Sequence, residues 1–272
     1  MTEADISTTD SRTRVVFDLL DAAGVPILRI TPAEAKSDRA LIHFHGGGYR
    51  KGSPQHFAES VGRIALACQM QIFSVGYRLS TVSPFPAAVD DALVAYQWIT
   101  EQIRPDRIAL WGDSAGGGLA AALLLRLRDL EISSPAGAFL FSPWADLRNT
   151  AETYSENSAT DDLFSLTQAI EAAESYLAGH PATDPLASPV LGSWSNQPRL
   201  VVQVSDAEVL YGDGVLLAQT AAAAGTDVRL KIHKGMPHIW NLAYPSTPSS
   251  KEAISYMIEN LHELFDSNIE TG

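Results

Sequence analysis

The sequence has a single cysteine, Cys68, among its 272 residues, so no disulfide can form within the chain. Cys68 lies in the apolar-spaced stretch RIALACQM, which is typical of a packed thiol, and the lack of disulfides favours a cytoplasmic location. The N-terminus, MTEADISTTDSRTR, has neither the basic start nor the apolar run of a signal peptide. No stretch of about 18 consecutive apolar residues occurs, so we expect no membrane span.

Basic residues are also scarce. Lysine and arginine total 19 against 32 aspartates and glutamates, which gives a formal net charge of -13. This balance argues against nucleic acid or an anionic membrane surface as a partner. The sequence contains no internal repeat and no low-complexity linker. With 46% hydrophobic residues it can bury a sizeable core, and we predict a single domain over residues 1–272.

Strand-like and helix-like segments alternate along most of the chain. This order predicts an α/β fold with a mostly parallel sheet, helices on both faces, and functional loops at the carboxyl ends of the strands. The alternation is interrupted between Ala145 and Pro198, where one amphipathic helix, SLTQAIEAAESYLAG, lies among polar loops. We expect a small cap from about residues 1–22 and 145–185. The predicted strands lie in Val25–Ile30, Ala40–Phe44, MQIFSVGY, RIALWG, AGAFLFSPW, RLVVQVS and DVRLKIHK.

Ser114 lies between a predicted strand and a predicted helix, in the stretch Gly112-Asp113-Ser114-Ala115-Gly116. A sharp strand-to-helix turn brings backbones close together, and glycines on both sides of the serine remove the side chains that would collide. The serine hydroxyl then projects from the turn at the positive end of the following helix. This G-x-S-x-G pattern predicts a nucleophile, whereas the alternative interpretation is a helix N-cap serine.

A glycine run follows an earlier predicted strand, in His45-Gly46-Gly47-Gly48-Tyr49. Glycines let backbone N–H groups face a substrate without interference from side chains, which suits an oxyanion hole. The candidate donors are the N–H groups of Gly46, Gly47, Gly48 and Ala115. We interpret His45 as an orienting or structural histidine.

The general base and its acid should lie beyond Ser114, because α/β-hydrolases with a G-x-S-x-G turn have the chain order Ser, acid, His. His233 lies inside a predicted strand and His262 inside the terminal helix. His238 lies in the loop GMPHIW just after that strand and is therefore the candidate base. The residues leave the acid open, because two carboxylates, Asp206 and Glu208, follow the strand RLVVQVS and a third, Asp213, begins the next helix.

Together these motifs resemble the hormone-sensitive-lipase-like branch of the α/β-hydrolase esterases. The family implies an eight-stranded, mostly parallel sheet, a small cap, and ester hydrolysis with no cofactor and no metal. Its usual Gly-x-x-Asp-x-Leu loop, aligned on Leu210, places the acid at Glu208, with Ser205 in place of the glycine and Asp206 as the alternative. For the oxyanion hole, the family pattern indicates chiefly the N–H groups of Gly47 and Gly48. The resemblance depends on HGGGY, YRL…PFPAAVDDALVAYQW, GDSAGGGLA, SPWADL, DPLASP and GMPHIW.

The resemblance predicts a serine carboxylesterase that acts on short- to medium-chain esters through an acyl-enzyme. Lactone hydrolysis is the enzymatic alternative, and a non-catalytic small-ligand receptor is the alternative of a different class. Ser80 to Ser83 stand where similar proteins often have Ala-Pro-Glu-His, so a supporting hydrogen bond could be lost or rebuilt. The terminal helix and DVRLKIHK could form the edge of a homodimer. Candidate substrate contacts are Tyr49, Trp144, Phe164, Tyr211 and Trp240.

Overall fold

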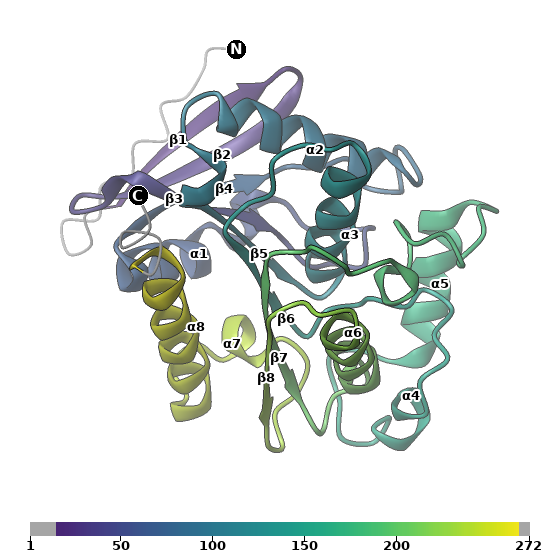
Figure 1. Ribbon diagram of the computed structural model, residues 1–272. Coiled ribbons are helices and arrows are strands. Elements are labelled where there is room, and N and C mark those ends of the chain that lie inside the picture. The colour runs from purple at the N-terminus through teal and green to yellow at the C-terminus, as the bar shows by residue number, and fades with distance from the viewer. Residues whose placement is uncertain (1–14, 267–272) are drawn as a thin grey trace, which may run out of the picture.

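The computed structural model describes residues 15–266, which form one eight-stranded sheet in the order β1-β2-β4-β3-β5-β6-β7-β8 (Figure 1). β1 pairs antiparallel with β2, β2 pairs antiparallel with β4, and all the remaining pairs are parallel. The predicted fold class is confirmed. The strands are β1 Val15–Ala22, β2 Val25–Pro32, β3 Lys36–Phe44, β4 Met70–Val75, β5 Ile108–Asp113, β6 Gly137–Phe141, β7 Arg199–Ser205 and β8 Val228–His233.

Helices cover both faces of the sheet. α1 and α8 pack on one face, around a buried cluster that includes Trp111 and Met257, while α2, α3 and α6 pack on the other face (Figure 1). These five helices span α1 Pro54–Cys68, α2 Ala87–Thr100, α3 Ala115–Asp129, α6 Tyr211–Ala223 and α8 Pro248–Asp266. Cys68 is buried at the end of α1, in agreement with its interpretation as a packed thiol. Within the described residues, no helix has the length and apolar composition that a membrane span requires.

The predicted N-terminal part of the cap needs correction. Residues 15–22 form β1, an edge strand of the sheet, and only residues 1–14 of that predicted cap segment lie outside the described residues. β1 turns back into β2 through Ala23 and Gly24, which both have positive φ, of 52° and 95°. Two such residues between antiparallel strands make a tight hairpin turn. The hairpin therefore extends the sheet instead of covering the site.

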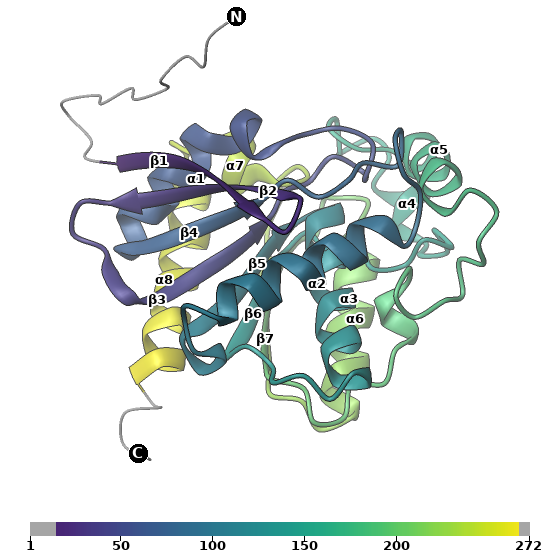
Figure 2. The same cartoon turned by 90° about the horizontal axis from the view of Figure 1, so that it is seen from above.

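Besides a 3-10 helix at Pro189–Leu191, the chain between β6 and β7 forms two α-helices, α4 (Thr153–Glu156) and α5 (Leu166–Leu177). Both lie to the side of α3 and α6 in the two views (Figures 1 and 2). Tyr154 of α4 and the buried face of α5 both join the hydrophobic cluster on the α2, α3 and α6 side. The remaining short helix, α7 (Trp240–Ala243), follows β8.

Candidate active site

Ser114 occupies the turn between β5 and α3, with φ 56° and ψ -123°. Such positive φ is costly for a residue with a side chain and is retained only where the surroundings impose it. The two flanking glycines make room for this tight turn. A Cβ on Gly112 would collide with the carbonyl of Gly116, and a Cβ on Gly116 would collide with the carbonyl of Phe44 on the neighbouring strand. The turn therefore has the geometry that the G-x-S-x-G spacing predicts.

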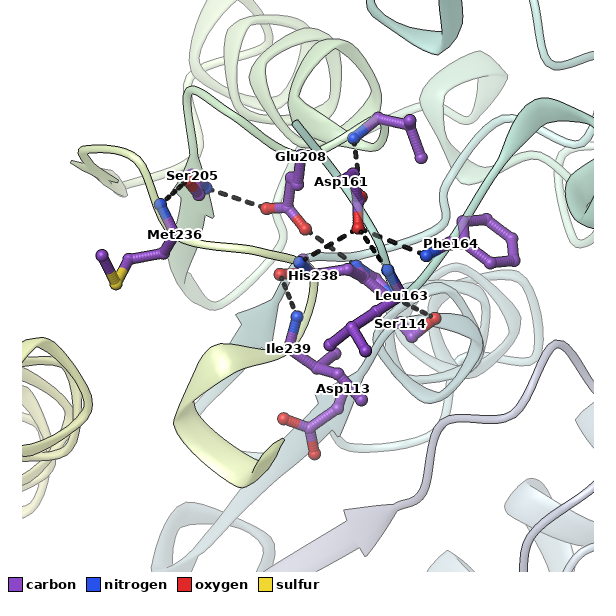
Figure 3. A network of polar contacts seen from close by, with 12 residues as sticks. Asp113, Ser114, Asp161, Leu163, Phe164, Ser205, Glu208, Met236, His238 and Ile239 are labelled. Atoms are coloured by element: carbon purple, nitrogen blue, oxygen red, sulfur yellow. Dashed lines mark hydrogen bonds and ion pairs between the residues drawn. The ribbon is translucent and has the colours of Figure 1, made fainter. Parts of the chain in front are cut away.

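Three side chains that are distant in the sequence form a continuous hydrogen-bonded chain (Figure 3). His238 Nε2 lies 2.8 Å from Ser114 Oγ, and His238 Nδ1 lies 2.8 Å from Glu208 Oε2. An ionised carboxylate only accepts hydrogen bonds, so Nδ1 donates to Glu208 and Nε2 is left to accept from the serine hydroxyl. This is the tautomer that a general base for Ser114 requires.

Glu208 and Asp206, the two candidate acids of the β7 loop, lie in different positions. Glu208 is fully buried and its Oε1 accepts a hydrogen bond of 2.8 Å from the Ser205 N–H, which leaves Oε2 directed at His238. Asp206 instead accepts from the N–H of Gly235. Asp213, the third candidate, is buried in α6 and accepts from the N–H groups of Ala145 and Asp146. Among the three, the structure brings only Glu208 to the imidazole.

Ser205, which replaces the glycine usual in the family, supports both loops. Its hydroxyl accepts from the N–H of Met236, two residues before His238, and from the N–H of Ala207. Asp206 makes a second link to the same β8 loop through Gly235. These hydrogen bonds tie the loop that carries Glu208 to the loop that carries His238.

The glycine loop after β3 lies directly against the nucleophile. A Cβ on Gly46 would lie 3.2 Å from Ser114 Cβ, and Gly47 and Gly48 have φ of 123° and 62°. Within residues 15–266, no hydrogen bond engages the N–H groups of Gly47, Gly48 or Ala115. Free backbone donors beside a serine hydroxyl are what an oxyanion hole requires.

His45 supports this loop from behind, as the sequence predicts for a structural histidine. Its Nδ1 lies 2.7 Å from the Gly46 carbonyl oxygen, and its ring stacks on Tyr77 with the centroids 4.4 Å apart. Burial lowers the pKa of His45 to about 4. The hydrogen bond to Gly46 raises the pKa and so opposes this effect, whereas the neighbouring His43 and His56 lower it slightly further. The ring is therefore neutral at physiological pH.

Three of the predicted substrate contacts form an aromatic run that ends at the base. Phe164 stacks on the His238 ring with the centroids 5.3 Å apart, Trp144 lies 6.0 Å from Phe164, and Tyr49 lies 6.1 Å from Trp144. Phe164 is half-buried, whereas Tyr49 and Trp144 are buried. Tyr211 is half-buried at the start of α6.

Trp240 does not belong to this run, and its predicted role as a substrate contact is wrong. Its side chain is fully buried in the cluster on the α1 and α8 side of the sheet, where it packs 4.8 Å from the His233 ring. The residue lies two positions after His238, but Ile239 takes a positive φ of 46° and α7 then begins. This reversal directs the indole into the core.

A buried polar network beneath the nucleophile was not predicted. Asp113 accepts from Asn241 of α7 through Oδ1, and its Oδ2 lies 3.2 Å from His43 Nε2; His43 Nδ1 in turn lies 2.9 Å from Ser74 Oγ. The network links the residue before Ser114 to the helix after His238. The sequence signal for it is the polar residue His43 inside the apolar stretch Ala40–Phe44.

The segment Ser80 to Ser83, which differs from the Ala-Pro-Glu-His often found in similar proteins, makes hydrogen bonds of its own. Ser80 Oγ lies 2.9 Å from Ser175 Oγ of α5, and its N–H donates to the carbonyl of Tyr49 at 2.7 Å. Tyr49 itself stacks face to face on Tyr176, with the centroids 3.8 Å apart and the planes within 4° of parallel. This segment therefore makes its own polar contacts with α5 next to the glycine loop.

Residues 41–242 match the family described as the alpha/beta hydrolase fold. The chain belongs to this α/β-hydrolase family. The acetyl-hydrolase of Streptomyces hygroscopicus is 40% identical over 229 residues, which cover 83% of this chain and 75% of that protein.

Solved α/β-hydrolase structures narrow the assignment. An esterase from the bacterial hormone-sensitive lipase family has a TM-score of 0.90 and 36% identity, with 93% of this chain and 85% of that one covered. EstE5 soaked with p-nitrophenyl butyrate also has a TM-score of 0.90, with 33% identity over 93% of this chain and 86% of that one. The chain is therefore an esterase of the hormone-sensitive-lipase-like branch, as its motifs predict.

Proposed function

We propose that this chain is a serine carboxylesterase in which Ser114 is the nucleophile, His238 the general base and Glu208 the acid that orients it. The observation that supports this assignment is the unbroken chain of two 2.8 Å hydrogen bonds from Glu208 through His238 to Ser114. A purely structural serine would need neither the strained turn nor the buried carboxylate behind the histidine.

The reaction follows from the atoms that these side chains present. His238 Nε2 takes the hydroxyl proton as Ser114 Oγ attacks the ester carbonyl, and the resulting imidazolium is stabilised by Glu208 through Nδ1–H. His238 then protonates the leaving alcohol as the carbon–oxygen bond breaks. Water attacks the acyl-serine with the same base, which releases the carboxylic acid and returns the proton to Ser114.

The negative charge of the tetrahedral intermediate develops beside the glycine loop. We assign its stabilisation to the N–H groups of Gly47, Gly48 and Ala115, with Gly46 nearby. Their freedom from other hydrogen bonds within the described residues supports this role. One such donor contributes about 3 kcal/mol to lowering the barrier in characterised hydrolases.

The site favours short acyl groups in this proposal. Phe164 stacks on the His238 ring, Trp144 lies next to Phe164, and Tyr49 lies next to Trp144. Ser114 itself is buried. The relative from Streptomyces hygroscopicus is named an acetyl-hydrolase, and a butyrate ester was soaked into EstE5. We therefore propose short- to medium-chain esters as the substrate class. A cytoplasmic location and a homodimer built on α8 and β8 stay predictions.

Hydrolysis of p-nitrophenyl acetate and butyrate by the Ser114→Ala variant tests the proposal. The variant should lose turnover, with a residual rate at least about 10³-fold below wild type, because the acyl-enzyme cannot form. Ser158→Ala, at an exposed serine of the cap segment, is the matched control and should retain full activity. Comparable turnover in both variants would refute the assignment of the nucleophile.

A further inference from the structure

The carboxylate of Asp161 lies between the two loops that carry Glu208 and His238 (Figure 3). Asp161 belongs to the connection between α4 and α5, far from both loops in the sequence, and it is buried. None of the motifs that predict the active site includes it. Its hydrogen bonds nevertheless reach the loop of the acid, the loop of the base and the residue whose ring stacks on the base.

Four backbone N–H groups donate to this one carboxylate. Oδ2 accepts from Val209 at 3.0 Å, and Oδ1 accepts from Leu163 and Phe164 at 3.2 Å each and from His238 at 3.4 Å. Three of these bonds converge on Oδ1, and the bond from the His238 N–H is the longest of the four. Hydrogen bonds to a charged acceptor are also the stronger kind.

The partners of Asp161 are adjacent to the reacting groups. Val209 directly follows Glu208, and another of the four donors is the backbone N–H of His238 itself. The Phe164 N–H belongs to the residue whose ring stacks on the His238 imidazole. One carboxylate thus fixes the acid loop, the base loop and the aromatic ring against the base.

Neighbouring side chains of the same segment contact the acid loop but do not extend to the base. Asn157 donates to the carbonyls of Asp206 and Glu208, Thr160 to that of Ala207, and Thr153 to that of Val209. These are neutral bonds to one loop only. Asp161 differs because it is charged and because it alone among these four side chains bonds to His238.

We propose that Asp161 is a positioning residue that holds the His238 ring in register between Glu208 and Ser114. This inference rests on the proposed triad and deepens it. Without the carboxylate, the two loops lose their shared anchor, and the imidazole spends less time aligned with both partners. The loss should affect the chemical step more than substrate binding.

The test compares Asp161→Asn with two control variants, with kcat expressed per active site titrated by an organophosphonate. The asparagine keeps the shape but puts an NH₂ group where an acceptor is needed. We expect kcat per site to fall about 10- to 100-fold, as the loss of one or two charged hydrogen bonds implies, with KM changed less than about threefold. Asp162→Asn changes an exposed neighbour. Thr160→Ala removes bonds to the carbonyls of Ala207 and Asn157 but none to the loop of His238. Both variants should stay within about threefold of wild type.

A second readout separates positioning from general support of the fold. The proton between His238 Nδ1 and Glu208 should give a low-field NMR signal in wild type, and this signal should weaken or broaden in Asp161→Asn. If Asp161 served stability alone, the variant would melt earlier but show unchanged kcat per titrated site and an unchanged signal, and the proposal would be overturned. Asp161→Glu keeps the charge but displaces it, and it serves as the test if the asparagine variant does not fold. A wild-type kcat per site in Asp161→Glu would also overturn the proposal.

The two proposals can fail separately. An active Ser114→Ala variant would remove the triad and, with it, the basis for a positioning role. An inactive Ser114→Ala variant combined with a fully active Asp161→Asn variant would leave the triad in place and reject only the role of Asp161.

Discussion

The Ser205 N–H donates to Oε1 of Glu208 at 2.8 Å, so the carboxylate can present only Oε2 to His238. Ser205 stands where similar enzymes have glycine, yet its contribution through the backbone needs no side chain. Its hydroxyl adds contacts to Met236 and Ala207 that a glycine could not make. The Ser205 backbone thus orients the acid, and its hydroxyl ties the acid loop to the loop that carries His238.

Replacing the two carboxylates of this loop should give very different results. Glu208→Gln leaves an amide that cannot hold the imidazolium, and kcat should fall about 10³- to 10⁴-fold. Asp206→Asn weakens only a bond to the Gly235 backbone and should cost less than about tenfold. Steady-state kinetics with p-nitrophenyl butyrate measures both. A larger loss in Asp206→Asn than in Glu208→Gln would transfer the acid role to Asp206.

Gly47→Ala should damage the oxyanion hole. The residue has φ 123°, and a Cβ there would collide with the Lys51 carbonyl, so the loop must shift. We expect kcat to fall about 100-fold or more, in line with the loss of one oxyanion donor. Gly24→Ala is the matched control, because Gly24 also has a positive φ, 95°, but has open space around it in the β1–β2 turn. Equal activity loss in both variants would indicate backbone strain as the common cause.

The buried His45 makes stability depend on pH. Its folded-state pKa of about 4 lies below the ordinary value of 6.5, so between these two values the unfolded chain binds a proton that the folded chain does not. The free energy of unfolding therefore falls as the pH drops through this window, by about 3 kcal/mol from this residue. The loss should be complete near pH 4 and absent above about pH 6.5.

Urea unfolding of wild type and His45→Gln between pH 7 and pH 4 tests this effect. Other groups titrate in both proteins, so the informative quantity is the stability difference between them. Wild type should lose about 3 kcal/mol more than the variant on acidification. Parallel curves for the two proteins would show that His45 is not the source of the dependence.

Several parts of the site could be predicted because local sterics fix them. At Gly112, Gly116 and Gly47 a Cβ would collide with a backbone carbonyl, so these glycines, together with the predicted strand ends before them, identify the turns. His238 was predicted from its place after β8, because strand ends in a parallel sheet converge. Glu208 needed the family comparison, since two carboxylates follow the same strand and only tertiary contacts separate them.

Other features depend on contacts that no local pattern reveals. β1 carries the partly exposed stretch VVFDLLDA, whose mixed pattern gives a weak strand signal, and it exists because it pairs with β2. Trp240 was misplaced because a single positive φ at Ile239 reverses the direction of the chain. Asp161 is one acidic residue in a polar loop, and its importance comes from N–H groups contributed by two distant loops.

The β1–β2 hairpin has a consequence for how this scaffold can be altered. Because residues 15–22 complete the sheet, the described part of the predicted cap comes from one uninterrupted piece of chain, between β6 and β7. Both ends of that piece join adjacent strands, so an engineer could exchange it in a single graft to change the acyl preference. Any donor segment would have to bring an equivalent of Asp161, or the transplanted enzyme would gain a new pocket and lose the alignment that makes it work.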